Sequence, residues 1–188
     1  TVDREAMTVT VLAGTPLHVL NERLQGLGLA LHNMGDIDRQ TVAGAIATGT
    51  HGTGGHWASL SAQVAGLEVV TGDGSLVQAG PNGTAEEAAL FQAARLGLGA
   101  VGILTAVTFL VEPAFALEAV EEPLSWSEVV DGFDELVGGA EYAEAYWFPH
   151  TDRMLTKRNV RLDADLSEAE PLPRWRSWLD DDFLSNTF

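Results

Sequence analysis

The first residues alternate between β-branched and small side chains, which predicts a strand over residues 7–14, MTVTVLAG. Thr15 and Pro16 follow and predict a helix with Thr15 as its N-cap and proline at its first position. Apolar residues then recur at helical spacing, and glycines that can end the helix come next. The expected buried stripe is Leu17, Leu20, Leu24 and Leu27, and the expected ends are Gly26 and Gly28.

A hairpin, a helix and a buried strand are predicted in the middle of the chain. Residues 63–80 contain two strand-like runs joined at Gly72-Asp73-Gly74, residues that tolerate the positive φ of a tight turn. Residues 84–87 match a capping box, and residues 101–112, VGILTAVTFLVE, have the composition of a strand buried on both faces. The helix opened by the capping box is expected to place Ala88, Phe91, Ala94 and Leu98 on one side and to end at Gly97 or Gly99.

The composition changes after Pro113, which predicts a second unit. Residues 115–122 and 142–150 are strand-like, and a second capping box lies at residues 125–128 between them. The helix that it opens is expected to bury Val129, Phe133 and Leu136. Residues 162–173 are expected to form a surface connection before a tryptophan-rich helix from about Arg174. We therefore predict one unit over residues 1–112 and another over residues 113–188.

Charge and cysteine content narrow the class of protein. The 188 residues carry a formal net charge of −17 and 46% hydrophobic residues, so a real core is expected and nucleic acid is not expected as a partner. The absence of cysteine excludes disulfides and fits a cytoplasmic location. The longest uncharged run, residues 96–111, is too short to span a membrane, so membrane association is not indicated. Because the chain starts without Met or a leader-like segment, we expect a piece of a longer protein.

Residues 35–56, GDIDRQTVAGAIATGTHGTGGH, concentrate glycine and threonine. One interpretation is a backbone cradle, in which missing side chains let amide groups approach an anion or a ring closely. The other is a small-residue helix over TVAGAIATG that packs tightly and ends at the glycines. Hydrogen-bonding side chains among the glycines favour the cradle. They are Thr41, Thr48, Thr50 and His51.

Other motifs are weaker. Residues 97–102 match G-x-G-x-x-G, but a helix precedes them and a strand follows, the reverse of a dinucleotide fingerprint. Residues 49–56 lack the Lys-Ser/Thr ending of a P-loop. No carboxylate has ligand-like spacing to the histidines, so no metal is expected; His51 is interpreted as a donor to a cofactor, and His32 and His56 as ordinary polar residues.

A histidine and a carboxylate stand two residues apart in residues 146–152, YWFPHTD. His150 and Asp152 could orient a substrate or a neighbouring strand at the end of a strand. A turn in which Asp152 bonds its own backbone explains them equally well.

Two segments, GDIDRQTVAGAIATGTHGTG and YWFPHTD, resemble the vanillyl-alcohol-oxidase-type FAD flavoproteins, and among them the sugar-1,4-lactone oxidoreductases acting on L-gulono- or D-arabinono-1,4-lactone. The resemblance implies an α+β fold: an incomplete FAD-binding domain followed by the start of an α+β substrate domain. It also implies FAD contacts, largely through backbone groups, with Ile103 meeting the adenine. The implied cofactor-binding residues are Gly35, Asp36, Thr41, Gly44, Thr48, Gly49, Thr50, His51, Gly52 and Ile103.

The implied reaction is oxidation of the lactone at C2, with hydride transfer to flavin N5 and electrons passing to O2 or another acceptor. A small residue at Gly35 weakly favours O2. No catalytic side chain is assigned, because the family's first pyrophosphate loop and its catalytic C-terminal part have no match here. The isolated 188 residues are therefore expected to be inactive. An alditol oxidase of the same architecture and a non-catalytic interaction module are the alternatives.

Overall fold

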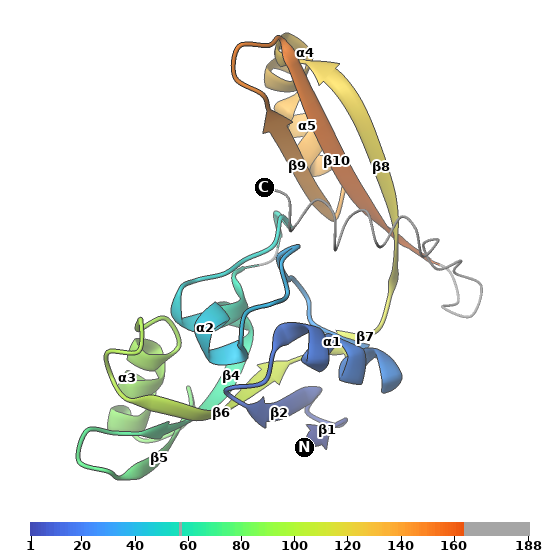
Figure 1. The fold of residues 1–188 in the computed structure, drawn as a ribbon. Coiled ribbons are helices and arrows are strands. Elements are labelled where there is room, and N and C mark those ends of the chain that lie inside the picture. Colours follow the sequence, from blue (N-terminus) through green and yellow to red (C-terminus); the bar gives the residue numbers. More distant parts are fainter. Residues whose placement is uncertain (57, 164–188) are drawn as a thin grey trace.

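The computed structural model describes residues 1–56 and 58–163. Within that part of the chain it contains two larger antiparallel sheets, one two-stranded sheet and five α-helices (Figure 1). The predicted connection from residue 164 on and the tryptophan-rich helix lie outside the described residues. Helices and antiparallel sheets are combined in each half, so the α+β prediction is confirmed.

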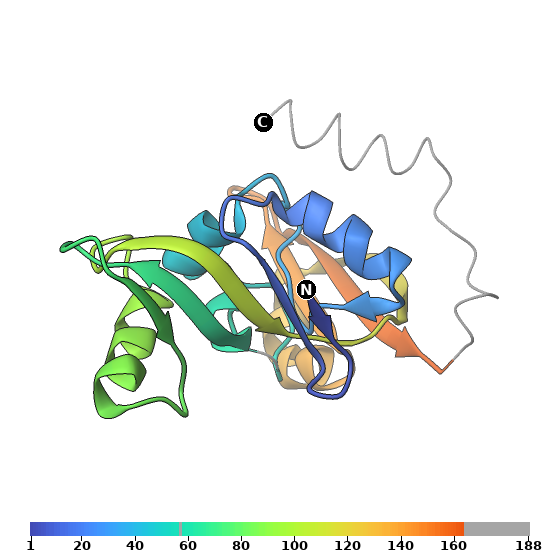
Figure 2. The same cartoon turned by 90° about the horizontal axis from the view of Figure 1, so that it is seen from below.

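The first sheet has five strands in the order β1-β2-β6-β4-β5. Its strands are β1 (Val2–Asp3), β2 (Thr8–Leu12), β6 (Ile103–Leu110), β4 (Val64–Val70) and β5 (Leu76–Ala79). The sheet is strongly twisted, as the view from below shows (Figure 2). The predicted strand at residues 7–14 and the predicted hairpin are confirmed, and Gly74 supplies the positive φ of the turn at +85°.

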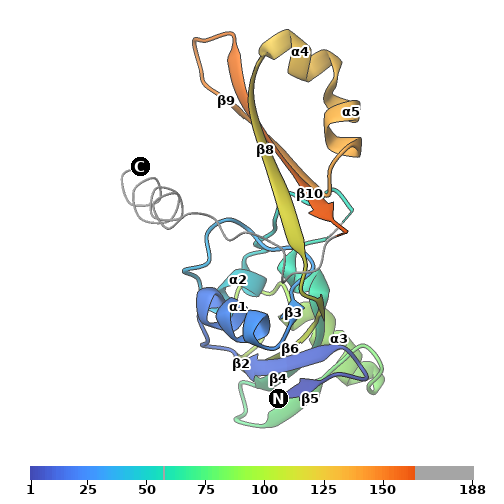
Figure 3. The same cartoon turned by 90° about the vertical axis from the view of Figure 1, so that its right-hand side faces the viewer.

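Helices α1 (Leu17–Gly26) and α2 (Val42–Ala47) lie on the side of this sheet that faces the second sheet (Figure 1 and Figure 3). Leu17, Leu20 and Leu24 are buried as predicted, but Leu27 is 41% exposed because the helix ends at Gly26. The N-cap prediction is also wrong. Pro16 occupies that position in an extended conformation, because residue 16 pairs with residue 41 in a β-bridge before the helix begins.

The capping box at Thr84 is confirmed and opens α3 (Ala85–Ala94), which packs against β5 and β4. Phe91 and Ala94 are buried, whereas Leu98 is 77% exposed because it lies beyond the helix in a left-handed conformation. Strand β6 follows, so the helix-before-strand order around residues 97–102 is confirmed. Burial of β6 on both faces is wrong: Val107 and Phe109 are buried, but alternate residues are not. Antiparallel sheets often keep one face open to solvent.

The second sheet has three strands in the order β8-β10-β9, with bounds Ala116–Ser125, Arg153–Leu162 and Tyr142–Trp147. The capping box at Ser125 is confirmed and opens α4 (Trp126–Asp131), which is followed after Gly132 by α5 (Phe133–Gly138). This break leaves Phe133 52% exposed instead of buried, while Val129 is buried. The central strand, β10, was not predicted from the sequence.

The two sheets are joined by a small two-stranded sheet, in which β3 (Leu29–Ala30) pairs with β7 (Glu112–Pro113). The chain passes from β7 directly into β8, which extends away from the first sheet (Figure 3). A buried core fills the space under α1 and α2 in the first unit. Segments from both units therefore meet next to β3 and β7, and this junction positions the site described below.

Candidate functional site

An open pocket of about 350 Å³ lies where the glycine-rich segment meets the second sheet. Its size falls in the range of about 300–1,000 Å³ that is usual for small-molecule sites. Five of the ten residues expected to bind a cofactor line it: Gly35, Asp36, Thr50, His51 and Gly52. The other lining residues are Ile37, Gln40, Thr53 and Glu144.

The lack of side chains at two glycines allows the two walls of this pocket to touch. A Cβ atom at Gly52 would collide with the Asn33 side chain and with the Met34 carbonyl oxygen. A Cβ atom at Gly35 would lie 3.1 Å from the His51 carbonyl oxygen. The segments around residues 33–36 and 50–53 therefore pack backbone against backbone. Part of the glycine requirement thus comes from protein contacts and not from a ligand.

Backbone N–H groups remain available on both walls. Within the described residues, the N–H groups of Gly35, Asp36, His51 and Gly52 donate to no protein oxygen. The side chain of His51 turns back, with Nδ1 2.9 Å from the Gly52 carbonyl oxygen. Unpaired amides along an open pocket can donate hydrogen bonds to an anion or to the acceptor atoms of a ring.

Four of the other expected contact residues belong to α2 and its ends, outside the pocket lining. Thr41 is the N-cap, and its hydroxyl accepts from the Gly44 N–H at 3.2 Å. Thr48 donates to the Gly44 carbonyl at 2.9 Å, and Gly49 ends the helix with φ +72°. Of the two interpretations of the glycine-rich segment, the small-residue helix therefore describes residues 42–47 and the exposed backbone describes its flanks. FAD contacts of these four residues remain predictions.

Loss of the N-cap should destabilise α2. We expect Thr41→Ala to lower the free energy of unfolding by about 1 kcal/mol, because the Gly44 N–H loses its acceptor. Thr41→Ser keeps the hydroxyl and should retain most of the stability. Urea denaturation of the three proteins checks this; equal midpoints for the alanine variant and the unmodified protein would show that the cap contributes nothing.

Ile103 lies at the start of β6, outside the pocket lining, and its side chain is 70% exposed. It pairs with Val70 across the sheet. The adjacent Gly102 has φ +144°, and a Cβ atom there would lie 2.5 Å from the Val70 carbonyl oxygen. The glycine therefore permits close approach of two strands, and the adenine contact of Ile103 remains a prediction.

His150 and Asp152 occupy the tight connection between β9 and β10, outside the pocket lining. His150 has a φ of 68°. The turn is closed by Thr151, whose hydroxyl donates to the Phe148 carbonyl at 2.8 Å and accepts from the Arg153 N–H. The turn interpretation is supported, although the bonding side chain is Thr151 and not Asp152.

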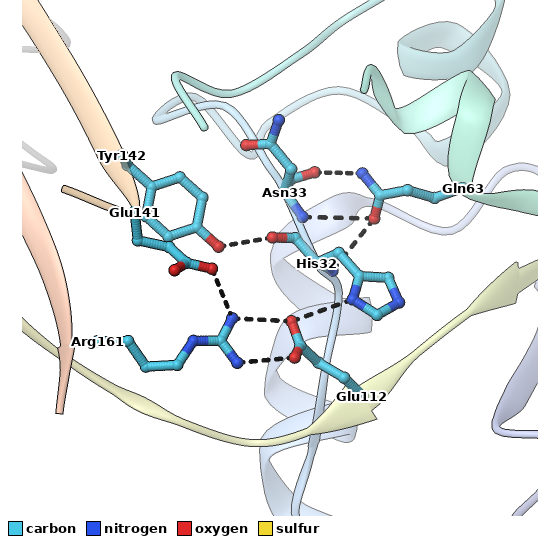
Figure 4. Close-up of polar contacts among 7 residues, drawn as sticks. All are labelled: His32, Asn33, Gln63, Glu112, Glu141, Tyr142 and Arg161. Carbon is cyan, nitrogen blue, oxygen red and sulfur yellow. Dashed lines mark hydrogen bonds and ion pairs between the residues drawn. The ribbon is translucent and has the colours of Figure 1, made fainter. Parts of the chain in front are cut away.

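A polar network holds the two units together beside the pocket (Figure 4). Arg161 of β10 donates to both carboxylate oxygens of Glu112, at 2.8 and 3.1 Å, and to Glu141 at 3.2 Å. Its guanidinium carbon lies 3.8 Å from the centroid of the Phe115 ring. Its hydrogen bonds to Glu112 raise the pKa of Arg161, so it stays charged. His32 adds a contact to the same carboxylate, with Nδ1 3.1 Å from a Glu112 oxygen.

The same network holds two chain segments that lead to the pocket. The Tyr142 hydroxyl donates to the His32 carbonyl at 2.6 Å. Gln63 accepts from the His32 and Asn33 N–H groups and donates to the Asn33 carbonyl at 2.7 Å (Figure 4). His32 and Asn33 lead directly to Gly35, and Tyr142 leads to Glu144. The network therefore fixes the segment that leads to Gly35 and the start of strand β9, and both contribute residues to the pocket.

Sequence reasoning missed the charged residues that the second sheet brings to the pocket. Glu144 lines it from β9, and the Lys157 ammonium of β10 lies 3.5 Å from Glu144 and 3.8 Å from Asp36. Tyr146 donates to Glu144 at 2.7 Å, and burial followed by this bond raises the pKa of Tyr146. The one local signal was that Lys157 is the single lysine of the chain.

The described residues contain neither a metal-ligating cluster nor a helix that could span a membrane. No group of three metal-ligating side chains occurs among residues 1–56 and 58–163. In the same part of the chain, every helix is too short or too polar to cross a bilayer.

Two family models match the chain. Residues 1–80 match the FAD binding domain, and residues 107–188 match D-arabinono-1,4-lactone oxidase. D-arabinono-1,4-lactone oxidase of Yarrowia lipolytica is 36% identical over 91% of this chain and 32% of that protein. L-gulono-1,4-lactone dehydrogenase of Mycobacterium tuberculosis is 34% identical over 97% of this chain and 40% of that protein.

Among solved structures, cholesterol oxidase from Brevibacterium sterolicum superposes with a TM-score of 0.77 at 25% identity, over 88% of this chain and 34% of that one. The chain thus spans about a third to two fifths of the length of the curated relatives named above.

Proposed function

Because the chain belongs to the vanillyl-alcohol-oxidase-type FAD flavoproteins that include the sugar-1,4-lactone oxidoreductases, we propose that it is part of an enzyme that oxidises a sugar 1,4-lactone at C2. The substrate class is L-gulono- or D-arabinono-1,4-lactone, and the electrons pass to O2 or another acceptor.

The observation that carries this proposal is the set of unpaired backbone amides on the open pocket. Gly35, Asp36, His51 and Gly52 belong to two chain segments that line one pocket, and within the described residues their N–H groups have no protein acceptor. The residues present fit FAD, whose phosphates and ring oxygens and nitrogens are hydrogen-bond acceptors. When bound, FAD supplies the acceptor for the hydride that leaves the CH–OH carbon.

The chain itself supplies binding and orientation. The rigid contact between residues 33–36 and 50–53 holds the amide donors in place before a ligand arrives, so less ordering is required on binding. The Tyr146 hydroxyl keeps its proton and holds one Glu144 oxygen. Placing a substrate between fixed groups contributes to catalysis because a bound reactant needs no further alignment.

Substrate profiling of the full-length, FAD-loaded protein tests the proposal. We expect turnover of L-gulono-1,4-lactone or D-arabinono-1,4-lactone and little turnover of the alditols xylitol and sorbitol. Turnover of alditols without any turnover of lactones would contradict the proposed substrate class. A full-length protein that is colourless and does not take up added FAD would contradict the flavoenzyme itself.

A further inference from the structure

Three charged side chains from both units meet beside the pocket: Asp36 and Glu144, which line it, and Lys157, which pairs with both carboxylates. The Lys157 ammonium lies 3.8 Å from an Asp36 oxygen and 3.5 Å from Glu144 Oε1. We infer that this cluster binds the hydroxyl groups of a neutral polyhydroxy substrate and rejects the anion that forms when the lactone ring opens. The inference rests on the proposed function and adds the residues that set its selectivity.

The geometry leaves acceptor atoms for a ligand. Glu144 uses Oε2 to accept from Tyr146 and Oε1 to contact Lys157, so its orientation is fixed from two sides. Asp36 is 67% exposed at its side chain and has one cation as its partner. Because Asp36 lines the pocket and its side chain is largely exposed, a hydroxyl group can donate to its remaining lone pairs.

The charge of the cluster favours a neutral ligand over an anionic one. Two carboxylates and one ammonium carry a net charge of −1 when all are ionised. A sugar lactone is neutral and rich in hydroxyl donors. Hydrolysis of the lactone adds water across the ring ester and releases an aldonate anion and a proton. The aldonate and the cluster are both negatively charged. Aldonate binding should be weaker, because like charges in a partly desolvated site repel.

Opposite charge changes should therefore have opposite effects. Glu144→Gln or Asp36→Asn removes one negative charge while keeping the shape, and should strengthen aldonate inhibition relative to lactone binding about tenfold. Lys157→Met removes the cation and should weaken aldonate inhibition about tenfold while raising the KM of the lactone. Lys157→Arg keeps the charge and should restore selectivity close to that of the unmodified protein.

The adjacent residue provides a matched control. Arg158 lies next to Lys157 on β10, but its guanidinium pairs with Glu122 of β8 at 2.6 Å, whereas Lys157 pairs with the pocket residues Asp36 and Glu144. Arg158→Met changes the net charge of the protein as Lys157→Met does. It should leave the ratio of aldonate to lactone affinity within about threefold.

The experiment measures lactone KM and kcat and the inhibition constant of the corresponding aldonate on the full-length holoenzyme. Calorimetric binding of both compounds is measured on the same proteins. Opposite shifts of the affinity ratio in Glu144→Gln and Lys157→Met support the inference. A ratio that stays constant across the variants, or shifts equally in Arg158→Met, overturns it. If the unmodified protein binds no FAD and does not turn over lactones, the proposed function is contradicted instead. The ratio of aldonate to lactone affinity measured by calorimetry then still decides the role of the cluster.

Discussion

Replacing Gly52 with alanine should abolish flavin retention by the full-length protein and lower its free energy of unfolding by about 2–3 kcal/mol. The new Cβ atom would collide with the Asn33 side chain and the Met34 carbonyl. Neither can move easily, because Asn33 is 1% exposed and its backbone is held on both sides by Gln63. Overpacking of this kind costs about 1–3 kcal/mol, and here it also separates the two pocket walls.

Gly55→Ala is the control for this experiment. It adds the same methyl group three residues later, where the nearest atom is a Val137 methyl carbon at an ordinary 3.6 Å. The control should keep its visible flavin absorbance and its urea midpoint. If Gly52→Ala retains flavin as well as Gly55→Ala does, the close contact between the two segments does not shape the binding site.

Replacing Arg161 with leucine should lower the free energy of unfolding by about 2–3 kcal/mol. The substitution removes three hydrogen bonds to Glu112 and Glu141 and the contact with the Phe115 ring. Charged hydrogen bonds contribute about 1.5–3 kcal/mol, and fully buried ion pairs cost about 3–5 kcal/mol to break. The side chains of Arg161 and Glu112 are 29% and 14% exposed. The pair is therefore not fully buried, and the range for charged hydrogen bonds applies.

Arg158→Leu on the same strand is the matched comparison. Its partner, Glu122, lies within the second sheet, and the two side chains are 35% and 49% exposed. An exposed pair of this kind contributes less than about 1 kcal/mol. Urea denaturation of both variants measures the difference. Equal losses for Arg158→Leu and Arg161→Leu would show that the network between the units has no special role.

Local sequence patterns predicted those elements whose signals are local. The hairpin turn at Gly74 and the capping boxes at Thr84 and Ser125 depend on residues within a few positions of one another. Strand β10 was missed because it lacks a regular alternation of apolar and polar residues: the polar Thr156 is buried, and the polar run Lys157 to Asn159 interrupts the apolar residues. Its pairing with β8 and β9 stabilises it, and that pairing involves residues from 7 positions (Met154 with Trp147) to 46 positions (Leu162 with Ala116) away.

In the candidate site, too, local patterns predicted some features, whereas others depend on residues far apart in the sequence. The glycine-rich segment was predicted from its composition, and its flanks do form the pocket. Helix α2 was one of two alternatives, because small residues are compatible with both a helix and an exposed backbone. The contribution of Glu144 and Lys157 could not be predicted, since they lie more than a hundred residues from Asp36 and reach it only through the docking of the second sheet.

Hydrogen–deuterium exchange of the full-length protein with and without FAD tests the binding site most directly. The unpaired amides of Gly35, Asp36, His51 and Gly52 should exchange rapidly without FAD and become protected when it binds. The hairpin turn at residues 71–75 serves as an internal reference and should not change. Protection of both segments, 33–37 and 50–54, is the predicted result. FAD binding that leaves the exchange of both segments unaltered would contradict the account.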